Sequence, residues 1–160
     1  MTGARVGRGP AGWSGLPGWG GLPGWARWVL AGYAVGFTEG TCAHLLDLLR
    51  GGVRVYASYA PLPAQVFFVG LVVLDPLVVA LVLLGRPAAA RLACGVMVLD
   101  GIANWYVDWP LLRENPAWLL RPVGLLPITL FALFVVVTAA PVRRATRHRP
   151  CEQPPTAVAG

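Results

Sequence analysis

Four long apolar segments alternate with short polar connectors along most of the chain. They occupy residues 28–49, 66–84, 92–109 and 123–140. At 1.5 Å of rise per residue, each segment would form a helix of roughly 27 to 33 Å, which matches a bilayer hydrocarbon core of about 30 Å. The pattern therefore predicts an all-α chain in which four transmembrane helices form an antiparallel bundle.

The composition agrees with a membrane location. Hydrophobic types make up 56% of the 160 residues, charged types make up 12%, and the mean hydropathy is +0.62. A soluble domain normally has about a quarter of its residues charged, so this share cannot cover a water-facing surface. We expect a polytopic integral membrane protein that crosses the cell membrane several times.

The positions of the arginines predict the orientation. Because successive connectors alternate between the two sides, nine of the 13 arginines would lie on the side that holds both termini. Cytoplasmic loops carry an excess of basic residues, so both termini are expected to be cytoplasmic. Arg143, Arg144, Arg147 and Arg149 directly follow the last apolar segment, where they can bind anionic lipid headgroups. This topology signal explains the basic charge without nucleic-acid binding.

Two tails flank the predicted membrane domain of residues 25–141. Residues 1–24 are rich in Gly, Pro and Trp and repeat the sequence Gly-Leu-Pro-Gly-Trp at 15–19 and 21–25. This composition cannot sustain a helix, so we predict a disordered tail whose tryptophans contact the headgroup layer. Residues 142–160 are predicted to form a second tail, which is basic at first and then rich in proline.

Aromatic side chains mark the same boundaries. All seven tryptophans lie at or outside the ends of the apolar segments, as do Tyr56, Tyr59 and Tyr106. Rings with one polar atom are enriched where lipid meets water. The sequence therefore predicts that these rings lie at the two interfaces.

Five of the seven acidic residues fall within the predicted spans. Glu39, Asp75 and Asp100 lie near the span centres, and Asp47 and Asp108 lie closer to the ends. A central acid that faces lipid costs about 2.5 to 3.5 kcal/mol, so we expect the three central acids to face the bundle interior at one level. Exclusion of water favours the neutral form of a carboxyl group, so such a cluster can hold a proton or bind a cation.

One face of the first segment would carry its polar residues together with three glycines. These residues are Gly32, Gly36, Glu39, Gly40, His44 and Asp47. The glycines are four residues apart, a spacing that lets another helix approach closely. At 100° per residue, the opposite arc contains Leu30 and Phe37, and we expect it to face lipid.

The second and third segments continue the polar pattern. Asp100, Asn104 and Asp108 follow one another at intervals of four residues and so share a face. Asp75 precedes Pro76, which lacks an N–H group and therefore frees a backbone carbonyl at mid-depth. Together with the polar face of the first segment, these residues would form a track from the bundle centre toward the non-cytoplasmic surface.

No metal or cofactor site is expected. Cys42, Cys94 and Cys151 do not have the spacing of metal ligands. The chain contains no lysine, which excludes P-loop phosphate binding and Schiff-base chemistry.

Three functions remain open from the sequence. The first is a protein that binds or transports a proton, a cation or a small ligand through the acidic cluster. The second is a non-catalytic assembly subunit, in which the glycine stripe contacts a second copy or another membrane protein. The third is a lipid-active enzyme in which a neutral acid and a carboxylate exchange protons with a hydrophobic substrate, although no nucleophile motif supports it. Any single buried acid could also serve only to fix helix register.

The stretch 122–127, Pro-Val-Gly-Leu-Leu-Pro, resembles the start of the last helix in some members of the sterol-isomerase and sigma-2-receptor group. These are four-helix membrane proteins with buried carboxylates. The resemblance covers six residues, and the acid of the second segment does not match the group's pattern. It implies no role for any residue of this chain.

Overall fold

The computed structural model describes residues 18–120 and 124–147, and the remaining parts of both predicted tails lie outside this range. The described residues form four α-helices and no strand, which confirms the all-α prediction. The helices are α1 (Gly24–Gly51), α2 (Leu62–Leu83), α3 (Ala88–Glu114) and α4 (Leu125–Arg147). Two short 3₁₀ helices follow α1 and α3, namely η1 (Gly52–Ser58) and η2 (Pro116–Leu120).

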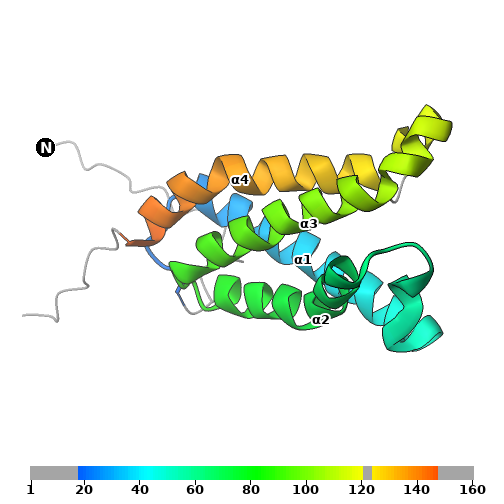
Figure 1. Cartoon of the computed structure of the whole chain (residues 1–160). Coiled ribbons are helices and arrows are strands. Elements are labelled where there is room, and N and C mark those ends of the chain that lie inside the picture. Colours follow the sequence, from blue (N-terminus) through cyan, green and yellow to red (C-terminus); the bar gives the residue numbers. More distant parts are fainter. Residues whose placement is uncertain (1–17, 121–123, 148–160) are drawn as a thin grey trace, which may run out of the picture.

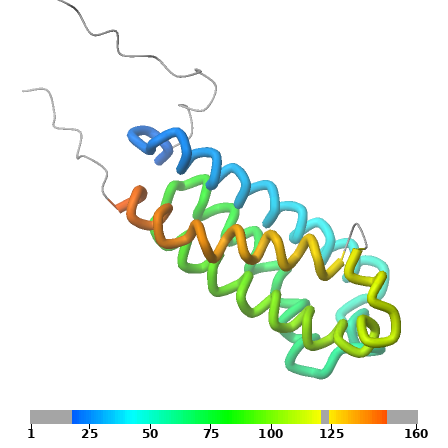
Figure 2. The backbone as a smooth tube through the Cα atoms, turned by 90° about the horizontal axis from the view of Figure 1, so that it is seen from above, coloured from blue at the N-terminus to red at the C-terminus, as the bar shows by residue number. Residues whose placement is uncertain are grey.

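The four helices run side by side in alternating directions (Figures 1 and 2). The two 3₁₀ helices lie at one end of the bundle, which we call the η end. The start of α1, the turn between α2 and α3 and the last turn of α4 lie at the opposite end, which we call the terminal end. α1 packs mainly on α2, and α3 packs mainly on α4. The bundle therefore consists of two helical hairpins placed against each other.

Two of the described helices, α2 and α4, are long and apolar enough to cross a membrane. The helices also extend beyond the predicted segments. α4 continues past residue 140 through Pro141 and includes the first arginines of the predicted tail. Val142 and Thr146 are buried, so packing against the bundle offsets the cost of proline inside this helix.

Residues 18–23 pack into the terminal end of the bundle. The Trp19 side chain is 0% exposed, and its Nε1 atom donates a hydrogen bond to the Val82 carbonyl at 3.0 Å. Leu22 is also buried beside it. The prediction that the tryptophans before α1 contact the headgroup layer is therefore wrong for Trp19. Trp25, which has the same position in the second copy of the repeat, is 48% exposed.

Tyr33 joins α1 to α4 inside the bundle. Its hydroxyl donates to the Val135 carbonyl at 2.9 Å and lies 2.9 Å from the Thr138 hydroxyl. Its ring meets the ring of Phe134 edge to face, with centroids 5.7 Å apart. A single tyrosine thus gives this helix pair both apolar contact and a satisfied polar group.

All four helices expose aliphatic side chains along their length. We call this surface the aliphatic belt; it includes Val35, Leu46, Val66, Val73, Leu99, Ile102, Leu130, Leu133 and Val137. Soluble monomers rarely expose a contiguous apolar patch of more than a few hundred Å². Every helix contributes to the aliphatic belt.

Candidate functional site: a buried polar track

Two of the three central acids are buried inside the bundle. Asp75 on α2 is 4% exposed and Asp100 on α3 is 8% exposed. The two carboxyl groups are close enough for their charges to interact. The structure therefore brings these two acids from different hairpins together, as the cost of exposing a charge to lipid led us to expect.

The Asp75 carboxyl group lies directly against the backbone of α1 at Gly40. A Cβ atom added to Gly40 would be 2.7 Å from Asp75 Oδ2, so only glycine leaves room for the acid. No hydrogen bond joins the Asp75 carboxyl group to another residue of 18–120 or 124–147, and its oxygens are not fully enclosed by the protein. This carboxyl group can therefore accept a proton or a hydrogen bond from a ligand without first breaking a hydrogen bond within the described residues.

Asp100 is held by the side chain one helical turn further along α3. The Asn104 amide donates to Asp100 Oδ1 and to the Asp100 carbonyl, each at 2.9 Å. The amide therefore fixes the orientation of the Asp100 carboxyl group. The predicted shared face of Asp100 and Asn104 is confirmed by this contact.

Glu39 is exposed, so the prediction that it faces the interior is wrong. The buried residues of α1 are Ala26, Leu30, Tyr33 and Phe37. Their face lies about 80° around the helix from the predicted one, and it includes two residues that we expected to face lipid. Burial of the two aromatic rings against α4 determines the rotation of α1, and the acid is then left outside.

Side chains of this chain cover all three glycines of the predicted stripe. Phe134 and Phe131 of α4 cover the first two glycines, and Asp75 covers the third. A Cβ atom at Gly36 would overlap the ring of Phe131. The stripe therefore serves packing within the bundle, which removes the reason to expect another protein on it.

Tyr56 connects the polar residues near the end of α1. It is 3% exposed because η1 folds back over the bundle, so the prediction that it lies at the interface is wrong. Its hydroxyl donates to Asp47 Oδ2 at 3.2 Å and lies 3.0 Å from His44 Nδ1. A phenol has one proton, so His44 Nδ1 must be the donor in the second bond. Both the tyrosine and the histidine rings pack on Phe68.

Tyr56 also links this group to α3. Burial raises the pKa of the Tyr56 phenol, and the charge of Asp47 and its hydrogen bond raise this pKa further. The charge of Asp100 makes a smaller contribution in the same direction, so Tyr56 lies within electrostatic reach of Asp100. We call the resulting series the polar track; it comprises Asp75, Asp100, Asn104, Tyr56, Asp47 and His44.

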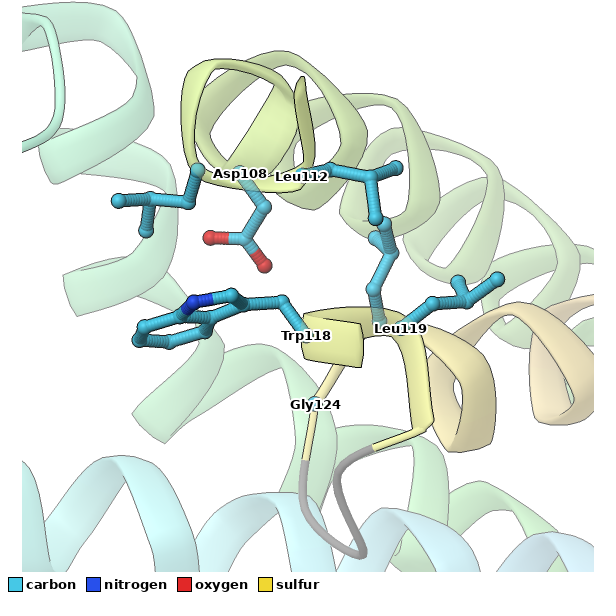
Figure 3. A pocket seen from close by; sticks show the side chains of 7 residues that line it. Asp108, Leu112, Trp118, Leu119 and Gly124 are labelled. Carbon is cyan, nitrogen blue, oxygen red and sulfur yellow. The ribbon is translucent and has the colours of Figure 1, made fainter. Parts of the chain in front are cut away.

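Asp108 lies beyond the track, near η2. It is half-buried, and its carboxyl group points toward the indole ring of Trp118 (Figure 3). The two line a pocket of about 110 Å³ together with Leu111, Leu112, Leu119, Gly124 and Leu125. The charge of Asp108 also influences Tyr59, which lines a separate groove with residues 105–107, 109 and 110 of α3. Asp108 therefore borders the pocket with Trp118 and influences the groove at Tyr59.

The described part of the chain contains no group of three or more His, Cys, Asp or Glu residues that could hold a metal ion. Comparison of the chain with protein-family models, curated proteins and solved structures finds no match. Arguments about function therefore rest on the geometry of the polar track and on the surface around it.

Proposed function

We propose that this chain is a four-span protein of the cell membrane that takes up a proton on Asp75 and Asp100, conducts it along the polar track and binds a small ligand near the η end. The observation that carries the proposal is the pairing of two buried carboxyl groups, one of which lacks a hydrogen bond within the described residues. A pair that only fixed helix register would be more stable if both members were hydrogen-bonded. An acid with a free lone pair is suited to reversible protonation.

The surface supports insertion of all four helices. The aliphatic belt includes residues of each helix, although α1 and α3 also carry the acids. In a bilayer this belt would contact lipid chains, and the acids of the track would remain inside. The exposed Glu39 is the exception, because near the centre of α1 it would face lipid at a cost of about 2.5 to 3.5 kcal/mol.

The arginines support the orientation. The terminal end holds Arg27, Arg86, Arg91, Arg143, Arg144 and Arg147, and the η end holds Arg50, Arg54 and Arg113. By the positive-inside bias, the terminal end and both termini would be cytoplasmic. Arg144 and Arg147 are exposed on the last turns of α4 and are suited to anionic headgroups, whereas Arg149 lies outside the described residues.

The track would then open toward the non-cytoplasmic side. From the central acids it continues through Tyr56 to Asp47 and His44, all near the η end. The terminal end is closed by the buried Trp19. A proton could enter past His44, Asp47 and Tyr56, which are joined by hydrogen bonds. The step from Tyr56 to Asp100 has no hydrogen bond among the described residues, and a conformational change would be needed for release to the cytoplasm.

The experiment is proton uptake by liposomes that contain the purified full-length chain and a pH-sensitive dye inside. A potassium gradient with valinomycin provides the driving force. Asp75→Asn and Asp100→Asn remove the titrating oxygen and keep the shape of the side chain. Glu39→Gln is the matched control, because it removes one acid from the same region of the bundle but from its outer surface.

We expect wild-type liposomes to acidify faster than empty ones, with at least a tenfold loss in both Asp variants and less than a twofold change in Glu39→Gln. Equal rates in the wild type and both Asp variants would contradict the proposal, as would a wild-type rate no higher than that of empty liposomes. Circular dichroism and gel filtration of each variant would establish that it is folded.

A further inference from the structure

An open groove lies at the η end, between the start of α2 and the outer part of α3. Its volume is about 570 Å³, and its lining is Tyr59, Pro61, Trp105, Tyr106, Val107, Trp109 and Pro110. We call it the aromatic groove. Four of these seven side chains are aromatic, and the volume falls within the range of roughly 300 to 1,000 Å³ that is common for small-molecule sites.

The two tryptophans of the groove are held in place by contacts within the chain. Trp105 Nε1 donates to the Thr129 hydroxyl on α4 at 2.9 Å. The rings of Trp105 and Trp109 have centroids 6.5 Å apart and planes at 40°. Neither ring therefore needs a large rearrangement to present part of its face to a ligand.

Two acids, Asp47 and Asp108, lie close enough to influence Tyr59, although neither lines the groove. Burial raises the pKa of the Tyr59 phenol, and the charges of Asp47 and Asp108 raise it further. Asp47 belongs to the polar track, and Asp108 lies on α3 next to Trp109. The arginines described at this end, which are Arg50, Arg54 and Arg113, are all exposed to solvent, where their charges are screened.

We propose that the aromatic groove binds a soluble organic ammonium cation, with a tertiary or quaternary nitrogen, as the small ligand of the proposed function. This inference rests on the proposed function and specifies its ligand class. Aromatic faces attract cations, and an ammonium ion with alkyl substituents loses little hydration when it contacts them. Aromatic rings that served only to contact lipid would need neither the two nearby acids nor a position beside the polar track.

The test compares choline with 3,3-dimethylbutan-1-ol, its uncharged analogue of nearly the same shape. Binding to the full-length protein in uncharged maltoside micelles is measured by isothermal titration calorimetry. Trp109→Leu removes one aromatic face, Trp109→Phe retains a ring, and Asp108→Asn removes a charge. Trp28→Leu is the matched control, because Trp28 is exposed on α1 and does not line the groove.

We expect choline to bind at least tenfold more tightly than the alcohol. Affinity for choline should fall about three- to tenfold in Trp109→Leu and in Asp108→Asn, recover in Trp109→Phe and stay unchanged in Trp28→Leu. Equal binding of choline and the alcohol would overturn the proposal. Unchanged affinity for choline in both Trp109→Leu and Asp108→Asn would also overturn it. Displacement of choline by short-chain phosphatidylcholine at a lower concentration than by free choline would also overturn it, because the occupant would then be a lipid headgroup.

Failure of this inference can be distinguished from failure of the proposed function. Choline binding is measured without a proton gradient, and proton uptake is measured without choline. If the wild type takes up protons but does not distinguish choline from the alcohol, only the ligand class is wrong. If choline binds as expected but Asp75→Asn and Asp100→Asn leave proton uptake unchanged, the groove is a cation site and the proton pathway is wrong.

Discussion

Replacement of Trp19 by alanine tests whether the turn before α1 is an integral part of the bundle. Trp19 is 0% exposed, and its indole N–H bonds to the last turn of α2 at Val82. Truncation of a fully buried aromatic side chain costs about 3 to 5 kcal/mol, and loss of the hydrogen bond adds about 1 kcal/mol. We therefore expect Trp19→Ala to reduce the free energy of unfolding by about 4 to 6 kcal/mol.

The internal repeat provides a matched control. Trp25 follows the same four residues as Trp19 but is 48% exposed, so Trp25→Ala should change the free energy of unfolding by less than about 1 kcal/mol. Trp19→Phe separates the two contributions, because it retains an aromatic ring and removes the hydrogen-bond donor. We expect this variant to lose about 1 to 2 kcal/mol.

The assay is equilibrium unfolding of the full-length protein in mixed micelles of maltoside and increasing SDS, followed by far-ultraviolet circular dichroism. Each variant is compared with the wild type at the same lipid-to-detergent ratio. The reasoning would be refuted if Trp19→Ala and Trp25→Ala had the same midpoint. A loss below about 1 kcal/mol in Trp19→Ala would likewise show that the turn detaches without cost.

Two further predictions concern the polar track. Gly40→Ala should reduce the free energy of unfolding by about 1 to 3 kcal/mol, because the added methyl group displaces the Asp75 carboxyl group. Gly70→Ala is the control and should cause no such loss, because no atom lies within 4 Å of the added carbon. Equal midpoints for the two variants in the SDS assay would count against this contact. Because the pKa of Tyr56 is raised in the folded state, the unfolded chain loses this proton first, near pH 10, and the free energy of unfolding should fall as the pH rises further. Tyr56→Phe should fall less steeply above about pH 10 in the same assay, and parallel curves would contradict the assignment.

The features that follow from the energetics of one helix could be predicted from the sequence. The apolar segments are long enough to specify four helices, which the structure contains. The cost of an exposed mid-span acid correctly indicated that Asp75 and Asp100 would be buried. These inferences need only the length and polarity of each segment.

Features that depend on pairs of elements could not be predicted in the same way. The rotation of α1 is set by Tyr33 and Phe37, whose partners are aromatic residues of α4 almost a hundred positions away. The polarity pattern of one helix predicts that Glu39 faces the interior, because this pattern contains no information about the aromatic partners on α4. Trp19 shows the same limit, since an identical pentapeptide at 21–25 leaves its tryptophan exposed.

Tyr56 was missed because its position depends on a chain reversal. The reversal occurs after α1, where Gly52 has a φ of 64°, a conformation that glycine adopts at little cost. The Gly51–Gly52 pair is a turn signal that could have indicated a fold-back of η1. The turn signal alone does not show that Tyr56 bonds to His44 and Asp47, because that depends on how η1 packs against the end of α1.

The division of the bundle into two hairpins has a consequence for its biosynthesis. Asp75 belongs to the hairpin made first by the ribosome, and Asp100 belongs to the hairpin made second. If the chain is inserted as proposed, the first hairpin carries a membrane-embedded acid with one side uncovered until α3 is made. An unfinished or truncated chain would therefore expose the Asp75 carboxyl group, which a membrane quality-control protease could recognise. This exposure ends when the two hairpins pack together.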